Sequence, residues 1–195
     1  MMTLHAVALH ECQPPGQNIF LTWRLKGSLP DHAQAVSSND ELGKRFFDVD
    51  RELDRAANGP LWLRLPRIAE AFFAALRTVC YQRIVEVPAY AVMGNHVHVL
   101  MKPIAPLSQI TRLVKGATAR QANLVLGLTG SHFWQDESFD LWIQNPEESQ
   151  RIRAYIERNP VAAGLVHKPE DWPWSSASRP LMLGSRSSLD DPEFM

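Results

Sequence analysis

Two short segments of this sequence hold four side chains that together could carry out chemistry on a phosphodiester. The first segment, residues 94–101, reads Gly-Asn-His-Val-His-Val-Leu-Met, and the second contains Tyr155 and Asn159. In a β-strand His96 and His98 point to the same face, because side chains alternate between faces with period two. On a helix Tyr155 and Asn159 lie about one turn apart on one face. Two imidazole nitrogens, an amide oxygen and a phenol are suited to binding a divalent metal and attacking a phosphate.

Each of these residues also has an ordinary structural interpretation. A histidine pair on a strand is more often part of a polar or half-buried face than of a metal site. Tyr155 could pack on the core with its hydroxyl at the rim. Asn159 precedes Pro160, and this pair is typical of a helix N-cap followed by the first helical residue. It is the occurrence of all four residues together that favours the catalytic interpretation.

The residues that alternate with the two histidines indicate which way the histidines point. Val97, Val99 and Met101 are apolar, so we expect them to face the helices of the fold. His96 and His98 would then lie on the open side of the sheet, where a ligand can reach them.

Length and composition are those of one globular domain over residues 1–195, with 45% hydrophobic and 21% charged residues. No apolar run approaches the roughly 20 residues of a membrane helix, so no membrane association is expected. Only two cysteines and no recognisable secretory leader indicate a reducing, cytoplasmic location. The net charge of −1 argues against unspecific coating of nucleic acid.

Basic residues nevertheless gather in one part of the chain. The stretch 102–135 contains no acid and these basic residues: Lys102, Arg112, Lys115 and Arg120. In a helix over 107–128 the last three share one side, and the opposite side is apolar: Leu107, Ile110, Leu113, Val114, Ala117, Leu124, Val125 and Leu128. A charge cluster is usually a solvated face, but solvated faces usually mix signs. We therefore predict that this side binds nucleic-acid phosphates.

The order of predicted elements favours an α+β fold. Strands are expected at 18–25, 88–93, 96–102 and 139–143, and helices at 66–83, 107–128 and 146–164, the last interrupted at Asn159-Pro160. A polar stretch at 28–60, with a short helix near 42–57, is interpreted as an inserted arm, and 166–195 as a C-terminal tail. This order predicts a ferredoxin-like split βαβ sandwich. Its antiparallel sheet would carry helices on one face and an added C-terminal helix with Tyr155.

Two longer strings resemble a known family. Residues 90–103 (YAVMGNHVHVLMKP) resemble the histidine-hydrophobe-histidine, or HUH, element of single-tyrosine transposases. Residues 155–176 (YIERNPVAAGLVHKPEDWPWSS) resemble the C-terminal signature of one branch, the REP-associated tyrosine transposases. Residues 113–126 and 133–143 are similar to the same branch. Residues 27–30 and 62–64 match a subgroup that carries an insert after the first strand.

The resemblance implies a function and roles for individual residues. Tyr155 would be the nucleophile of single-strand DNA cleavage through a 5′-phosphotyrosine link, with His96, His98 and Asn159 as ligands of Mg²⁺ or Mn²⁺. It also implies a bacterial, nucleoid-associated protein, monomeric or homodimeric, that binds single-stranded or hairpin DNA of repeated extragenic palindromes. Asn95, beside the histidines, is counted with the basic residues as a DNA-binding candidate.

The chain departs from the family pattern in three places. Gly94 stands where proline is usual, Ala162 stands where arginine is usual, and residues 141–145 lack the arginines common there. These differences affect the DNA sequence that would be recognised, and none of them falls on the four chemical residues.

Three other functions remain open from the sequence. One is a catalytically silent, hairpin-binding regulatory protein of the same fold. Another is an RNA-binding sheet, which predicts paired aromatic residues on the central strands. The third is a hydrolytic phosphodiesterase with two His-x-Thr/Ser motifs, although the chain has only one histidine pair.

Overall fold

The structure is a computed structural model that describes residues 16–29, 48–55 and 59–181. The expected helix near 42–57 falls partly outside these residues, as do the first fifteen residues and the end of the predicted tail. Within the described part, residues 48–55 are helical.

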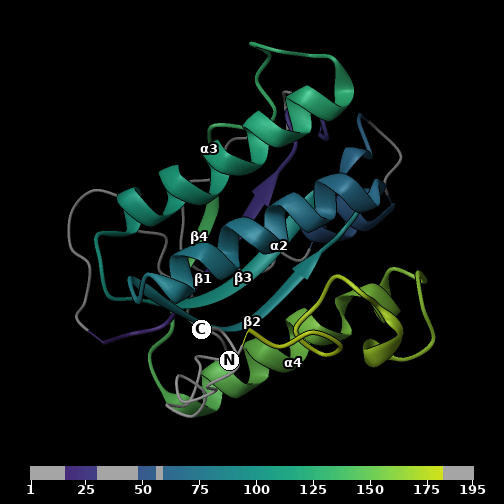
Figure 1. Ribbon diagram of the computed structural model, residues 1–195. Coiled ribbons are helices and arrows are strands. Elements are labelled where there is room, and N and C mark those ends of the chain that lie inside the picture. Colours follow the sequence, from purple (N-terminus) through teal and green to yellow (C-terminus); the bar gives the residue numbers. More distant parts are fainter. Residues whose placement is uncertain (1–15, 30–47, 56–58, 182–195) are drawn as a thin grey trace, which may run out of the picture.

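A four-stranded antiparallel sheet forms the centre of the molecule (Figure 1). Its strands are β1 (Ile19–Arg24), β2 (Val85–Val92), β3 (His96–Pro103) and β4 (Phe139–Trp142), in the order β2-β3-β1-β4. With a helix between β1 and β2 and another between β3 and β4, this is the ferredoxin-like arrangement that the sequence predicts. The two central strands, β1 and β3, pair along their length, and Thr22 lies opposite His98.

Two helices, α2 (Pro66–Tyr81) and α3 (Leu107–Leu126), cover one face of the sheet. That face is apolar because every second residue of β1 and β3 points to it, including Trp23, Val97 and Val99. The predicted apolar residues of α2 are all buried: Ala69, Phe72, Phe73, Leu76, Val79 and Cys80. The periodicity of this helix was therefore sufficient to identify its packed face.

A third helix, α4 (Pro146–Ala162), packs on the opposite face of the sheet, against β2 and β3. Ile152 and Ile156 of α4 form a second, smaller core with Phe20 and Leu100. This face of the sheet is itself largely apolar, so leaving it uncovered would expose hydrophobic surface to water. The expectation that the histidines lie on an open sheet face is therefore wrong, since His96 and His98 are both 0% exposed.

Two helix predictions need correction. Asn159-Pro160 does not interrupt α4, which continues to Ala162, and the chain leaves the helix at Gly164 with a positive φ of 70°. A proline this close to the helix end removes only one late backbone hydrogen bond.

In α3 the predicted apolar side is only partly buried, because Leu124 is 63% and Val125 42% exposed. A twenty-residue helix is about 30 Å long, whereas an eight-residue strand spans about 26 Å, so the last turns receive less cover from the sheet. The buried residues instead follow a spacing of four through the middle of the helix: Ile110, Val114, Thr118 and Ala122.

The segment after α4 covers the free edge of β2. Its Trp174 carbonyl accepts a hydrogen bond from Val92 N at 2.9 Å, and Ser176 N donates to the Tyr90 carbonyl at 2.9 Å. Further on, Arg179 binds both carboxylate oxygens of Glu70 on α2. The described beginning of the predicted tail is therefore part of the fold. No helix among the described residues is both long enough and apolar enough to cross a membrane.

Candidate active site

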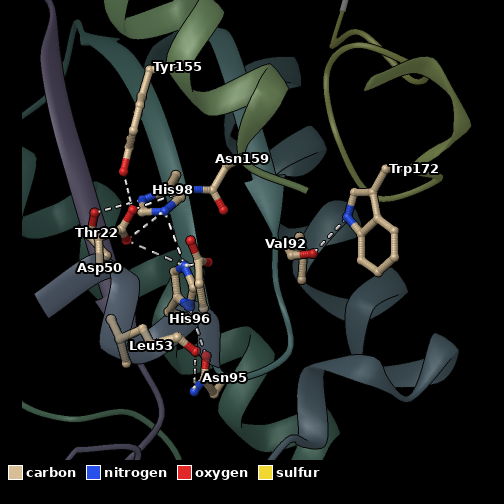
Figure 2. A network of polar contacts seen from close by, with 11 residues as sticks. Thr22, Asp50, Leu53, Val92, Asn95, His96, His98, Tyr155, Asn159 and Trp172 are labelled. Atoms are coloured by element: carbon tan, nitrogen blue, oxygen red, sulfur yellow. Dashed lines mark hydrogen bonds and ion pairs between the residues drawn. The ribbon is translucent and has the colours of Figure 1, made fainter. Parts of the chain in front are cut away.

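The histidine pair lies at the start of β3, immediately after a tight connection from β2. His96 and His98 both face α4, and their Nε2 atoms are 3.1 Å apart (Figure 2). The backbone of Gly94 in the connection accepts a hydrogen bond from Leu63 N at 3.2 Å, which ties the turn to the segment before α2. A side chain at Gly94 would also come within 3.0 Å of Arg64, so glycine suits this close contact better than the family's proline.

The outer nitrogen of each imidazole has a fixed partner. His96 Nδ1 lies 2.8 Å from Asn95 Oδ1, and His98 Nδ1 lies 2.8 Å from Thr22 Oγ1 of β1. In the tautomer in which both Nδ1 atoms donate, both Nε2 atoms present lone pairs to the same point. Hydrogen bonds of this kind orient metal-binding histidines in proteins.

A carboxylate that sequence reasoning missed completes this cluster. Asp50, in the helical residues 48–55, places Oδ1 3.1 Å from His98 Nε2 and 3.6 Å from His96 Nε2. One donor atom from each of the three residues lies within 4.8 Å of the others. The insert contains several acids, and nothing in its local pattern distinguishes Asp50 from Asp48 or Asp54.

The second oxygen of Asp50 contacts the two predicted residues of α4. Asp50 Oδ2 accepts a hydrogen bond from the Tyr155 hydroxyl and another, at 3.2 Å, from Asn159 Nδ2. The structure thus brings together the four residues predicted from the sequence, around one additional carboxylate (Figure 2). Asn159 Oδ1 is buried without a hydrogen-bond partner among the described residues.

The burial of this cluster changes how its groups ionise. Burial on its own would raise the pKa of Asp50, but His98 and His96 hold it below its usual range. Burial, followed by the charge of Asp50, raises the pKa of Asp54 to about 7. Burial, with the neighbouring His98, lowers the pKa of His96 to about 3.

Nucleophilic attack by Tyr155 requires a deprotonated phenol, but the surroundings of this residue favour the protonated form. Burial and then the charge of Asp50 raise the pKa of Tyr155 well above its usual value. Its ring is held edge-on to Phe20 and His98, with centroid distances of 6.2 and 5.9 Å. In this arrangement the phenol is positioned but protonated.

The cluster has the donor set and spacing of a divalent-metal site. Two ligands about 2.1 Å from a cation and at right angles lie about 3.0 Å apart, close to the 3.1 Å between the two Nε2 atoms. A cation would also relieve the repulsion between two lone pairs that face each other. His96, His98 and the Asp50 carboxylate therefore fit the metal that the sequence analysis expects, and the uncommitted oxygen of Asn159 is a further donor nearby.

The predicted DNA-binding residues are divided between the two faces of the sheet. Asn95 is 1% exposed and donates from Nδ2 to the Leu53 carbonyl at 3.0 Å. Lys102 follows the histidines along the same face of β3. The three residues of α3 lie on the opposite side of the sheet.

Those three residues also differ in their surroundings. Arg112 and Arg120 are exposed. The Lys115 ammonium donates to the Gln135 carbonyl at 2.8 Å, and burial lowers its pKa, against the opposing charges of Asp136 and Glu137. Lys115 is therefore less available than its neighbours to an external ligand.

The protein therefore has a ferredoxin-like sheet with a histidine pair on a central strand and a tyrosine on a helix that packs against the sheet. These features can be compared with those of known families. The family model described as "Transposase IS200 like" matches residues 63–159, which include both histidines, Tyr155 and Asn159. Residues 63–159 belong to the IS200-like transposase family, as the sequence resemblance predicts.

One solved structure supports the fold, and a second is reported beside it. A REP-associated tyrosine transposase bound to a REP hairpin aligns with 95% of this chain and 96% of its own, at 19% identity and a TM-score of 0.52. A Deinococcus radiodurans R1 protein assigned to the transposases covers 76% of this chain and 98% of its own, at 19% identity and a TM-score of 0.41. Among curated proteins, none matches the chain.

The contact between Thr22 and His98 leads to a prediction about metal affinity. Replacing Thr22 by Val keeps the shape of the side chain but removes the hydroxyl that orients the imidazole. We expect Thr22→Val to weaken Mn²⁺ binding by roughly 10- to 100-fold, the usual cost of losing such a partner, in a calorimetric titration. Thr78→Val is the matched control, because the exposed Thr78 hydroxyl donates to the Ala74 carbonyl of its own helix. Equal affinities in the two variants would contradict this role of Thr22.

Proposed function

We propose that this protein is a metal-dependent transesterase that cleaves and rejoins single-stranded DNA through Tyr155. The convergence of Tyr155, His96 and His98 on one carboxylate carries this proposal. A nucleophile and a pair of metal-binding nitrogens that share a single partner can also share a single phosphate. Membership of the IS200-like transposase family supports the same chemistry.

Each residue has a distinct part in the proposed reaction. His96 and His98 would hold the cation, with Asn159 as the third protein ligand in the DNA-bound state. When bound, the cation supplies Lewis acidity that polarises the phosphate and offsets its developing charge. Two imidazoles favour Mn²⁺ by ligand type, and Mg²⁺ completed by oxygen ligands is the alternative.

The covalent step exchanges one phosphodiester for another. The phenolic oxygen of Tyr155 loses its proton and forms a bond to phosphorus, and the bond between phosphorus and the 3′ oxygen breaks. The 3′ oxygen takes up a proton, and the 5′ phosphate remains attached to Tyr155. Because the ester bond is conserved, the reverse reaction can rejoin strands without a nucleotide cofactor.

The proposed partner is hairpin DNA with single-stranded flanks. The structural neighbour in its complex binds a REP hairpin, and we extend hairpin binding to this chain. Arg112 and Arg120 on α3, with Lys102 on the other face, are the proposed phosphate contacts, and Lys115 contributes if its bond to Gln135 opens. In the closed arrangement Asn95 acts instead through His96, by orienting its ring.

A catalytically silent hairpin-binding protein is the second candidate. The complete burial of His96 and His98, and the hydrogen bond from Tyr155 to Asp50, favour it, because no phosphate can reach the site in this arrangement. Formation of a covalent adduct with DNA separates the two candidates.

Tyr155→Phe removes only the nucleophilic oxygen. We expect it to abolish the covalent adduct between protein and a labelled hairpin in the presence of Mn²⁺, seen as a shifted band in a denaturing gel. Hairpin affinity should change by less than about twofold, since a single hydroxyl is lost. Tyr81→Phe is the control, because Tyr81 is 90% exposed on α2. An adduct at the normal rate in Tyr155→Phe would assign the nucleophile to another residue.

Asn159 provides a separate test of the metal ligands. Since Asn159 lies inside α4 and not at its start, substitution there does not remove an N-cap. Asn159→Ser shortens the side chain and should lower Mn²⁺ affinity and adduct formation about tenfold or more, whereas Asn159→Asp retains an oxygen at the same reach. Calorimetry and the adduct gel measure the two quantities. If the serine variant behaves like the wild type in both, Asn159 is not a ligand.

The α3 surface can be tested through the salt dependence of binding. Arg112→Ala should weaken hairpin binding and reduce the slope of log affinity against log salt by about 0.7 to 0.9, one phosphate contact. Arg67→Ala is the control, an exposed arginine on α2. Fluorescence anisotropy at several salt concentrations measures the slope. An unchanged slope in both Arg112→Ala and Arg120→Ala would remove α3 from the DNA-binding surface.

A further inference from the structure

The helical residues 48–55 cover the proposed active site. His96 and His98 are 0% exposed, and the residues that lie over them, Asp50 and Leu53, are each 2% exposed. The Leu53 carbonyl accepts a hydrogen bond from Asn95 Nδ2 at 3.0 Å, beside the histidines (Figure 2). The site therefore lacks a free approach for DNA in this arrangement of the described residues.

The contacts of Asp50 are those that a scissile phosphate must make. One carboxylate oxygen faces the two Nε2 atoms that would hold the cation, at 3.1 and 3.6 Å. The other oxygen accepts hydrogen bonds from the Tyr155 hydroxyl and from Asn159. A phosphate about to be attacked needs one oxygen on the cation and the tyrosine oxygen beside its phosphorus. The Asp50 carboxylate and the phosphate are both anionic groups with several oxygens. The two groups would therefore compete for the same position.

We propose that residues 48–55 form an autoinhibitory lid, with Asp50 occupying the position of the scissile phosphate. This inference rests on the proposed function and adds a regulatory step to it. DNA must displace the lid before cleavage, and until then the Tyr155 hydroxyl is held in its hydrogen bond to the carboxylate. With Asp50 withdrawn, the Asn159 amide loses the partner of its nitrogen, and its oxygen can turn toward the cation.

The contacts of the lid are few and lie on one side of it. Leu53 and Asp50 point into the molecule, whereas Arg51, Glu52 and Arg55 are exposed. Among the described residues, Arg51 and Arg55 pair with acids of the same segment, Asp48 and Glu52. Asp54 of the same segment also reaches the site, with Oδ1 3.7 Å from His96 Nε2. Displacing the lid therefore costs mainly the burial of one leucine and the interactions of two carboxylates.

The two ends of the insert are held together at its base. Gly59 has a φ of +72°, and a Cβ on it would lie 2.1 Å from the Gly27 carbonyl oxygen. Only glycine fits this contact, which joins the chain before the insert to the chain after it. The lid can therefore leave the site and remain tethered next to it. The segment matched by the family model, 63–159, does not include it.

Two other roles for Asp50 make the opposite prediction. If Asp50 were an obligatory metal ligand, or the base that deprotonates Tyr155, its removal would slow cleavage. If Asp50 is a competitor of DNA, its removal accelerates cleavage. A variant that loosens the lid but keeps the carboxylate separates the roles further. A metal ligand or a base must stay in place to act, so loosening the lid would then slow cleavage, whereas loosening a competitor would accelerate it.

The experiment compares three variants of the full chain. Asp50→Ala removes the competing carboxylate, Leu53→Asp expels the lid by placing a charge at a buried position, and Arg51→Asp is the control on the exposed side of the same segment. Each is incubated with Mn²⁺ and a labelled DNA hairpin carrying single-stranded arms of random sequence, and the rate of adduct formation is measured. Circular dichroism confirms that each variant is folded.

We expect Asp50→Ala and Leu53→Asp to form the adduct about tenfold faster than the wild type, since burial of one leucine is worth at least a power of ten in an equilibrium constant. Arg51→Asp should match the wild type. Slower adduct formation in both Asp50→Ala and Leu53→Asp would overturn the lid and make Asp50 part of the catalytic machinery, while leaving the proposed function intact.

A second readout needs neither metal nor DNA. Diethylpyrocarbonate modifies exposed imidazoles, and peptide mass spectrometry gives the extent at each histidine, with the exposed His132 as internal reference. His96 and His98 should react about tenfold faster in Leu53→Asp than in the wild type. Equal protection in both proteins would refute the lid. If no variant forms an adduct but this difference is found, the proposed cleavage fails and the lid stands.

Discussion

The site depends on keeping two imidazole rings inside a sheet face that is otherwise apolar. A buried polar atom without a partner costs about 1–3 kcal/mol, and His96 and His98 are completely buried. The partners of their outer nitrogens come from β1 and from the β2–β3 connection, and Asp50 of the insert faces their inner nitrogens. The strand and the connection must therefore be in place before the pair is stable, whereas the insert can leave without removing the partners of the outer nitrogens.

The position of the tyrosine follows from ordinary packing. Ile152 and Ile156 anchor α4 to the apolar residues beside the histidines, and Tyr155 lies between them in sequence. The helix that completes the second core therefore also carries the phenol to His98. The same sheet face provides both hydrophobic cover and chemistry, and this explains why the site is enclosed where an open surface was expected. An enclosed site strengthens electrostatic interactions, but the proposed substrate, DNA, would need a way in.

Asp50 affects both the electrostatics of the enclosed site and the access to it. Its carboxylate faces the buried imidazole nitrogens, and together with burial its charge holds the pKa of Tyr155 above its usual value. A carboxylate is a suitable temporary occupant because it offers two anionic oxygens, as a phosphate does. The histidine pair is thus oriented by Thr22 and Asn95, whereas Tyr155 is held by a residue from outside the family-matched segment.

Local patterns in the sequence determined the strands and the principal helices. They also determined that His96 lies beside His98 and that Tyr155 lies beside Asn159. Period two places His96 and His98 on one face, a spacing of four places Asn159 beside Tyr155, and both periodicities act over a few residues. Three features depended on packing between distant segments: the cover over the histidines, the buried side of α3, and the role of Asp50, which lies 105 residues before Tyr155. Only the tertiary structure decided these, because burial and charge pairing belong to whichever residues the fold brings together, and no local spacing encodes them.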